Sequence, residues 1–294
     1  MPTSKPAKRR SATVLQVVIR AVKSFIADDA LTLCAALSFY TLLSFAPLLV
    51  LAVWATGSLA PGAQDAMLGQ FGALAGEDAR LAAQAVVESA NERPALGSLA
   101  GVLGIGTSIV GATTVFAQLQ SSLNTLWGIE AKPQNAIWGW IRRRFLSIGV
   151  IAAIAFVLIA SLLASALLGL LLTRTGPVWD VLNQAISVLV FAALFALLFR
   201  YLPDARLPWR TAAWGGFVTA VLFGIGKWVI GLYLASGNVG GAYGAAGSLV
   251  VLLVWVYYSS AIFFFGAEGV QAWMVAHGKE ITPVEHAVRK DAKR

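Results

Sequence analysis

Long stretches without Asp, Glu, Lys or Arg dominate this chain of 294 residues. Four of these stretches are long enough for a helix that crosses a membrane, which needs about 20 apolar residues. They cover residues 30–64, 94–129, 145–173 and 181–199. A fifth region, 211–278, holds only two charged residues, Lys227 and Glu268. The glycine-rich segment 237–244 is a turn signal that divides this region into two helices.

The pattern predicts an all-α polytopic membrane protein with six transmembrane helices. The predicted spans are 31–57, 95–120, 145–172, 180–199, 211–235 and 247–275. Within the first span, Pro47 is expected to bend the helix because its ring removes a backbone hydrogen bond. We therefore divide the chain into a basic tail (1–29), a transmembrane domain (30–278) and a second basic tail (279–294).

A different pattern precedes the first span, over residues 13–26. Apolar side chains recur there at helical spacing on one face, and basic side chains such as Arg20 and Lys23 point elsewhere. The apolar face consists of Val14, Val18, Val22 and Phe25. This arrangement is typical of an amphipathic helix that lies on the inner leaflet of a membrane.

Composition and charge agree with a membrane protein. Hydrophobic residue types make up 58% of the chain and charged types only 12%, and one soluble core cannot hide so much apolar surface. Of the 22 Lys and Arg residues, 18 fall on one side of the predicted topology and 3 on the other, so both termini are expected to face the cytoplasm. The net charge of +8 then indicates contact with anionic phospholipid headgroups rather than with nucleic acid. Candidate contacts at the inner leaflet are Arg142, Arg143, Arg144, Arg206 and Arg210.

Groups that carry catalysis are scarce. The two histidines, His277 and His286, and the one cysteine, Cys34, cannot build a metal centre, and no set of Ser, His and Asp suggests a hydrolase. Segment 237–244 lacks the Gly-Lys-Ser/Thr ending of a phosphate-binding loop. We therefore expect no enzyme, no metal and no cofactor.

Lys227 and Glu268 are the candidates for a substrate path. Lys227 is predicted about 24 Å along its helix from the cytoplasmic side, where it either attracts an anionic headgroup or extends to the outer headgroups along its alkyl stem. Glu268 is expected near the inner end of the last span, about 14 Å away along the axis, so a direct ion pair with Lys227 is disfavoured. The favoured alternative for Glu268 is an interfacial carboxylate paired with a basic loop residue such as Arg210.

Polar and small residues in the spans have two interpretations. Gln120 and Asn124 share one helical face and either join helices by hydrogen bonds or line a cytoplasmic vestibule. Several glycines serve either close helix packing or the bending of a moving helix. These are Gly97, Gly101, Gly224 and Gly226.

Four segments, in the right order, resemble the YihY/BrkB family, also called virulence factor BrkB and once labelled ribonuclease BN. They are Ala35-Ala36-Leu37-Ser38-Phe39-Tyr40-Thr41-Leu42-Leu43-Ser44-Phe45-Ala46-Pro47-Leu48, Asn124-Thr125-Leu126-Trp127, Leu202-Pro203-Asp204-Ala205-Arg206-Leu207-Pro208-Trp209, and the stretch from Tyr243-Gly244 to Gly266-Ala267-Glu268. The resemblance implies a bacterial inner-membrane protein with six spans that contributes to envelope integrity. Tyr40, within the first segment, is a further candidate for the substrate path.

The leading hypothesis is a transporter or flippase for an anionic, lipid-like envelope component. Lys227 would attract the headgroup, and Pro47, Gly224 and Gly226 would supply bends. The alternative is a structural or assembly factor that works with envelope proteins and transports nothing. A channel ranks lower because no polar stripe repeats along one helix face. The ribonuclease hypothesis is rejected because the chain lacks both a metal-binding cluster and a soluble basic groove.

Overall fold

The computed structural model describes five longer parts of the chain and several isolated residues between 62 and 88. The longer parts are residues 13–57, 114–131, 177–236, 247–285 and 287–290. The predicted span 145–172 and most of the predicted span 95–120 lie outside the described residues. Five of the candidate residues also lie outside them: Gly97, Gly101, Arg142, Arg143 and Arg144.

The described residues form long helices wherever the sequence predicts them. Their bounds are α1 (Val14–Ala27), α2 (Ala30–Gly57), α7 (Pro177–Tyr201), α8 (Trp209–Ser236) and α10 (Gly247–Ala276). Each of these helices begins and ends within three residues of its predicted bounds, because the helices end where charged or turn-forming residues interrupt the apolar runs. The predicted end of the second span at 120 is wrong, since residues 114–126 are helical. The helix continues because its polar residues Gln120 and Ser122 are buried against the protein.

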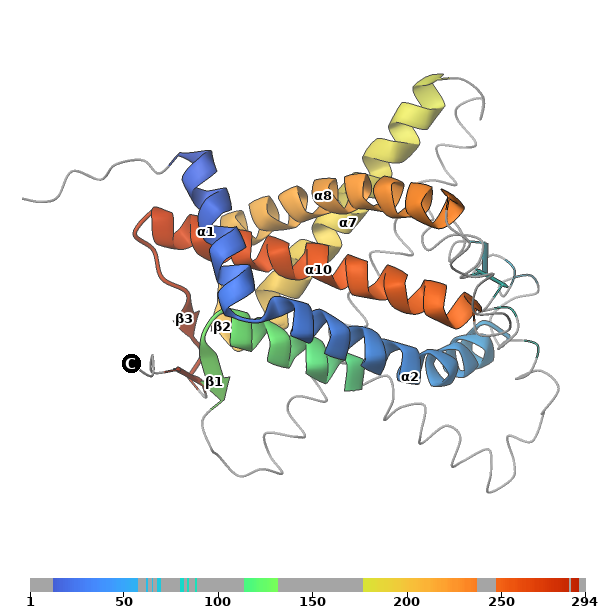
Figure 1. Cartoon of the computed structure of the whole chain (residues 1–294), viewed down its shortest axis with the longest axis horizontal. Coiled ribbons are helices and arrows are strands. Elements are labelled where there is room, and N and C mark those ends of the chain that lie inside the picture. Colours follow the sequence, from blue (N-terminus) through green and yellow to red (C-terminus); the bar gives the residue numbers. More distant parts are fainter. Residues whose placement is uncertain are drawn as a thin grey trace, which may run out of the picture.

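Helix α10 lies at the centre of the described structure. It runs between α8 on one side and α2 on the other, and α7 crosses behind α8 (Figure 1). Aromatic rings fill the space where α7, α8 and α10 meet: the ring of Phe223 lies 4.9 Å from that of Phe191, and Phe199 stacks on Phe263 at 5.0 Å. The core is therefore a contact between helices rather than between a helix and a sheet.

Three helices of the described part are long and apolar enough to cross a membrane. They contain Gln184–Tyr201, Trp209–Ile230 and Leu249–Ala276. Helix α1 and the first half of α2 pass the same test together, as a pair bent by 65°. The class of helical membrane protein is thus confirmed, whereas the number of six spans and the orientation of the termini stay predictions.

Helix α1 packs against α10 through a narrow stripe of apolar side chains. Val17 and Ala21 are buried against Ala272, and the ring of Phe25 meets that of Phe265 edge-on at 6.0 Å. Most of the predicted apolar face remains exposed, including Val14 and Val22. The helix is therefore amphipathic as predicted, but its contact with the protein is made mainly by other residues.

Four short strands lie together at one end of the molecule, which we call the strand end (Figure 1). Strand β1 (Ile129–Ala131) pairs antiparallel with β4 (Ala287–Arg289), and β2 (Ala205–Arg206) pairs antiparallel with β3 (Thr282–Pro283). The sequence predicted only a basic tail after residue 278. Instead, the described part of this segment pairs with the loops that follow residue 126 and helix α7.

Glycines allow the helices to approach closely. A Cβ atom at Gly216 of α8 would lie 2.5 Å from the backbone oxygen of Ala192 and 2.6 Å from the backbone nitrogen of Ala196, both on α7. Small residues at such positions are the common basis of helix packing in membranes, because they bring backbones into van der Waals contact.

Candidate functional site

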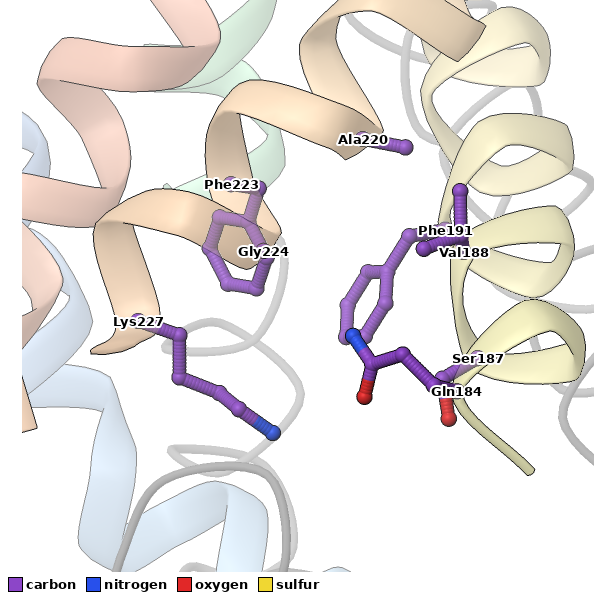
Figure 2. A pocket seen from close by; sticks show the side chains of 8 residues that line it. All are labelled: Gln184, Ser187, Val188, Phe191, Ala220, Phe223, Gly224 and Lys227. Carbon is purple, nitrogen blue, oxygen red and sulfur yellow. The ribbon is translucent and has the colours of Figure 1, made fainter. Parts of the chain in front are cut away.

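Lys227 lines a pocket between α7 and α8, which we call the Lys227 pocket. Its lining residues are Gln184, Ser187, Val188, Phe191, Ala220, Phe223, Gly224 and Lys227. The side chains of Lys227 from α8 and Gln184 from α7 point into the space between the two helices (Figure 2). The pocket has a volume of about 300 Å³, including its open mouth.

The residues that line the Lys227 pocket fall into an apolar group and a polar group. Phe191, Phe223 and Val188 contribute apolar side chains, and Lys227, Gln184 and Ser187 contribute polar groups. An ammonium group, an amide and a hydroxyl together can donate hydrogen bonds to phosphate or carboxylate oxygens. Gln184 and Ser187 come from α7 and were not among the predicted candidates.

The structure separates Lys227 from Glu268, as the sequence indicated. Helices α8 and α10 run antiparallel, since Gly215 faces Val270 and Gly226 faces Ile262. In this register Glu268 is level with a point about ten residues before Lys227, which corresponds to about 15 Å along the axis. The two residues therefore belong to different sites.

Asp204 is the centre of a polar network at the strand end. Its Oδ2 accepts a hydrogen bond from Asn124 Nδ2 at 2.9 Å, and its Oδ1 accepts one from Gln120 Nε2 at 3.3 Å. The backbone N–H of Asp204 donates to Asn124 Oδ1 at 2.8 Å. Gln120 and Asn124 therefore bind their helix to the loop that follows α7, rather than to a second helix. We call these three residues the Asp204 network.

Glu268 is completely buried, so the expectation of an exposed carboxylate paired with Arg210 is wrong. Gln271, in the amide orientation that satisfies its neighbours, donates from its Nε2 to Glu268 Oε2 at 3.0 Å and to the carbonyl oxygen of Leu126 at 3.1 Å. The side chain of Asp28 lies within hydrogen-bonding reach of Glu268. The bend between α1 and α2 is what brings this second carboxyl to α10.

Asp28 lies at the C-terminal cap of α1, outside the apolar runs. Burial raises the pKa of the Asp28 carboxyl, whereas the hydrogen bond with Glu268 and the positive charge of Lys290 act to lower it. Its neighbour Asp29 has a backbone φ of +50°, in the left-handed region. The chain changes direction sharply at this residue.

Trp127 ties the turn after residue 126 to α10. The indole is buried, and its Nε1 donates to the carbonyl oxygen of Ala267 at 3.1 Å. This contact lies one residue from Glu268 and helps to fix the helix segment that carries it.

We expect Trp127→Phe to lower the free energy of unfolding by about 1 kcal/mol, because the carbonyl of Ala267 loses its donor. Denaturant unfolding of the full chain in detergent micelles measures this change. Trp214→Phe is the matched control, since Trp214 is 66% exposed and should leave the midpoint unchanged. Equal effects of the two substitutions would contradict this role of the indole.

The remaining described candidates are two glycines of α8 and two residues of α2. Gly226 faces Tyr258 and Ile262 of α10, which supports its packing role, and Gly224 lines the Lys227 pocket. Tyr40 is half-buried on α2, with its ring 5.8 Å from that of Phe39. Helix α2 passes through Pro47, whose side chain lies outside the described residues, so the bend there stays a prediction.

Of the five candidate arginines, the two that the structure describes, Arg206 and Arg210, are both exposed. Arg206 forms an ion pair with Glu285 at 3.6 Å, and Arg210 begins the exposed side of α8. Contact of these residues with anionic lipid stays a prediction. Among the described residues, no group of three or more His, Cys, Asp or Glu side chains could hold a metal ion.

Long apolar helices packed through glycines and aromatic rings, with polar clusters at distinct depths, define a helical membrane protein. The model of the virulence factor BrkB family matches residues 21–291. The chain therefore belongs to the BrkB family.

Curated relatives agree with this assignment. A UPF0761 membrane protein of Alkalilimnicola ehrlichii is 28% identical over 83% of this chain and 55% of its own length. One of Verminephrobacter eiseniae is 28% identical over 83% of this chain and 58% of its own length. One of Photobacterium profundum is 25% identical over 91% of this chain and 86% of its own length. The chain thus spans between half and three-fifths of the first two relatives. No solved structure matches the chain.

Proposed function

We propose that this protein moves an anionic, lipid-like envelope component across the bacterial inner membrane, without enzymatic chemistry. The observation that carries the proposal is the Lys227 pocket, in which one ammonium group and two uncharged polar groups join apolar side chains between two membrane helices. A lipid presents the same division, since an anionic headgroup is joined to apolar chains. In this arrangement the headgroup would lie beside Lys227 while the chains stay in the bilayer.

The position of Lys227 supports the same function. It lies 18 residues after the start of α8, which is about 27 Å along the helix axis, within a run that is otherwise free of charge. This distance places Lys227 toward the far end of a hydrocarbon core of about 30 Å. A cation within a predicted span commonly marks the path of a substrate or ion. Helix packing alone gives no reason for a lysine at this position, whereas it accounts for Gly226 one residue earlier.

Transport can be tested with the full chain in proteoliposomes that contain fluorescent phosphatidylglycerol. We expect wild-type protein to move the labelled lipid between leaflets, and Lys227→Ala to slow this movement about tenfold. That factor corresponds to the loss of one charge-assisted contact of about 1.4 kcal/mol. A membrane-impermeant quencher reports the fraction of labelled lipid in the outer leaflet over time.

Two further variants make the test specific. Lys227→Arg keeps the charge and should retain most of the rate, and Lys279→Ala removes an exposed cation at the strand end and should change nothing. If Lys227→Ala moves lipid as fast as wild type, the role of the Lys227 pocket is refuted. If wild-type protein moves none, with or without an imposed proton gradient, the alternative of a structural or assembly factor takes its place.

A further inference from the structure

Two carboxyl groups from distant parts of the sequence meet where the bend between α1 and α2 touches α10. Glu268 is completely buried in α10, and Asp28 at the end of α1 lies within hydrogen-bonding reach of it. They are brought together because α1 packs along α10 through Val17 and Ala21, and the chain then turns by 65° into α2.

One oxygen of this pair is left without a donor. Glu268 Oε2 accepts the hydrogen bond from Gln271, but Oε1 is buried and has no hydrogen-bond partner in the described structure. A buried carboxylate oxygen without a donor is costly, and a second carboxylate beside it adds repulsion. A single proton between the two carboxyl groups removes both penalties, since it converts one oxygen into a donor for the other group.

The described charges around the pair do not supply a better counter-ion. From the strand end, Lys290 lies near enough to Asp28 to influence its charge, but its ammonium group already forms an ion pair with Glu130 at 3.4 Å. From α10 and from residue 126, the neighbouring groups are the uncharged amide of Gln271 and the carbonyl of Leu126. On the α2 side, Asp29 adds a further acidic group, although its side chain is exposed.

We propose that Asp28 and Glu268 form a carboxyl pair that binds one proton. While the pair carries this proton, it holds the bend between α1 and α2 against α10. Binding forms one O–H bond to a carboxylate oxygen with a proton taken from water, and release returns that proton to water. Loss of the proton leaves two negative charges in contact, so α1 moves away from α10. This inference goes beyond the proposed function and does not rest on it.

Infrared spectroscopy of the full chain in lipid nanodiscs tests proton binding without any transport step. We expect wild-type protein to show a protonated-carboxyl band at pH 7 that disappears in alkaline buffer. Glu268→Gln should lose this band at pH 7. Asp28→Asn should lose it as well, because the new amide donates to Glu268 and removes the need for the shared proton. Glu280→Gln, which removes an exposed carboxylate of the strand end, should leave the band unchanged.

Movement of α1 is measured with spin labels at two exposed positions, Val18 on α1 and Val275 on α10. The distance between the labels should increase in alkaline buffer in the wild-type background and should not respond to pH when Asp28→Asn is added. Asp28→Asn therefore still tests the proposal if Glu268→Gln fails to fold.

Three results would overturn the proposal. The first is a wild-type spectrum without a protonated-carboxyl band at pH 7, and the second is a band that survives in Glu268→Gln. The third is a band displaced by sodium at constant pH, which would assign the pair to a metal cation instead. Each of these results is independent of whether the proteoliposomes move lipid, so failure of this inference and failure of the proposed function are distinguishable.

Discussion

Replacement of Asn124 by alanine is expected to lower the free energy of unfolding by about 3 kcal/mol. The substitution removes a donor to Asp204 Oδ2 and an acceptor for the backbone N–H of Asp204. Asp204 is only 7% exposed, so water cannot readily replace these two contacts. Denaturant unfolding of the full chain in detergent micelles measures the change.

The neighbouring residue supplies the control for this prediction. Thr125→Ala removes a side chain on the exposed face of the same turn, whose hydroxyl bonds only the carbonyl of Ser121, and should cost less than about 0.5 kcal/mol. A double variant with Asp204→Asn should be less destabilised than the sum of the two single variants, because both substitutions disrupt the contact between Asn124 Nδ2 and Asp204 Oδ2. Strict additivity would show that Asn124 and Asp204 do not act together.

Gly216→Ala is expected to be the most destabilising single-methyl addition in the described helices, at up to about 3 kcal/mol. The new Cβ would lie within 2.6 Å of backbone atoms of Ala192 and Ala196. Backbone atoms cannot rotate away as a side chain can, so α7 and α8 must separate along their whole contact. The aromatic contacts between these helices, such as that of Phe191 with Phe223, would loosen as well.

Gly269→Ala is the matched control in α10, because no atom lies within 4 Å of the position that its Cβ would occupy. It should be neutral or raise stability by a few tenths of a kcal/mol, since alanine is the better helix former. Unfolding by sodium dodecyl sulfate, followed by circular dichroism, compares the two variants. A Gly216→Ala protein as stable as wild type would mean that the helices are not in the close contact seen here.

The helices could be predicted from the sequence because hydrocarbon imposes one simple condition. A segment that crosses it must be apolar and must satisfy its own backbone hydrogen bonds, so charges such as Asp180 and Arg200 mark the limits of the helices directly. The same condition says nothing about the strand end. Strands of two or three residues leave no periodic signal, and β1 pairs with a segment more than 150 residues later.

The candidate sites could be predicted only in part for a similar reason. Lys227 stood out because it is a single cation in an apolar run, and that signal is local. The partners Gln184 and Asp28 carry no such signal, since each becomes significant only through the helix that packs beside it. Two local signals do point to these sites: Asp204 lies between two prolines, and Asp28 with Asp29 directly precedes the first apolar run.

The pairing of β1 with β4 has a consequence for how the protein is made. Residue 129 leaves the ribosome well before its partner, residue 289. At about 5–20 residues per second, the first strand waits roughly 10–30 s for the second. During this interval the helices that follow residue 131 are inserted into the membrane, while the turn around Gly128 still lacks the hydrogen bond that Lys290 donates to it. Closure of this end is therefore a late event in biogenesis, and a chaperone or protease that recognises the unpaired turn could monitor whether insertion is complete.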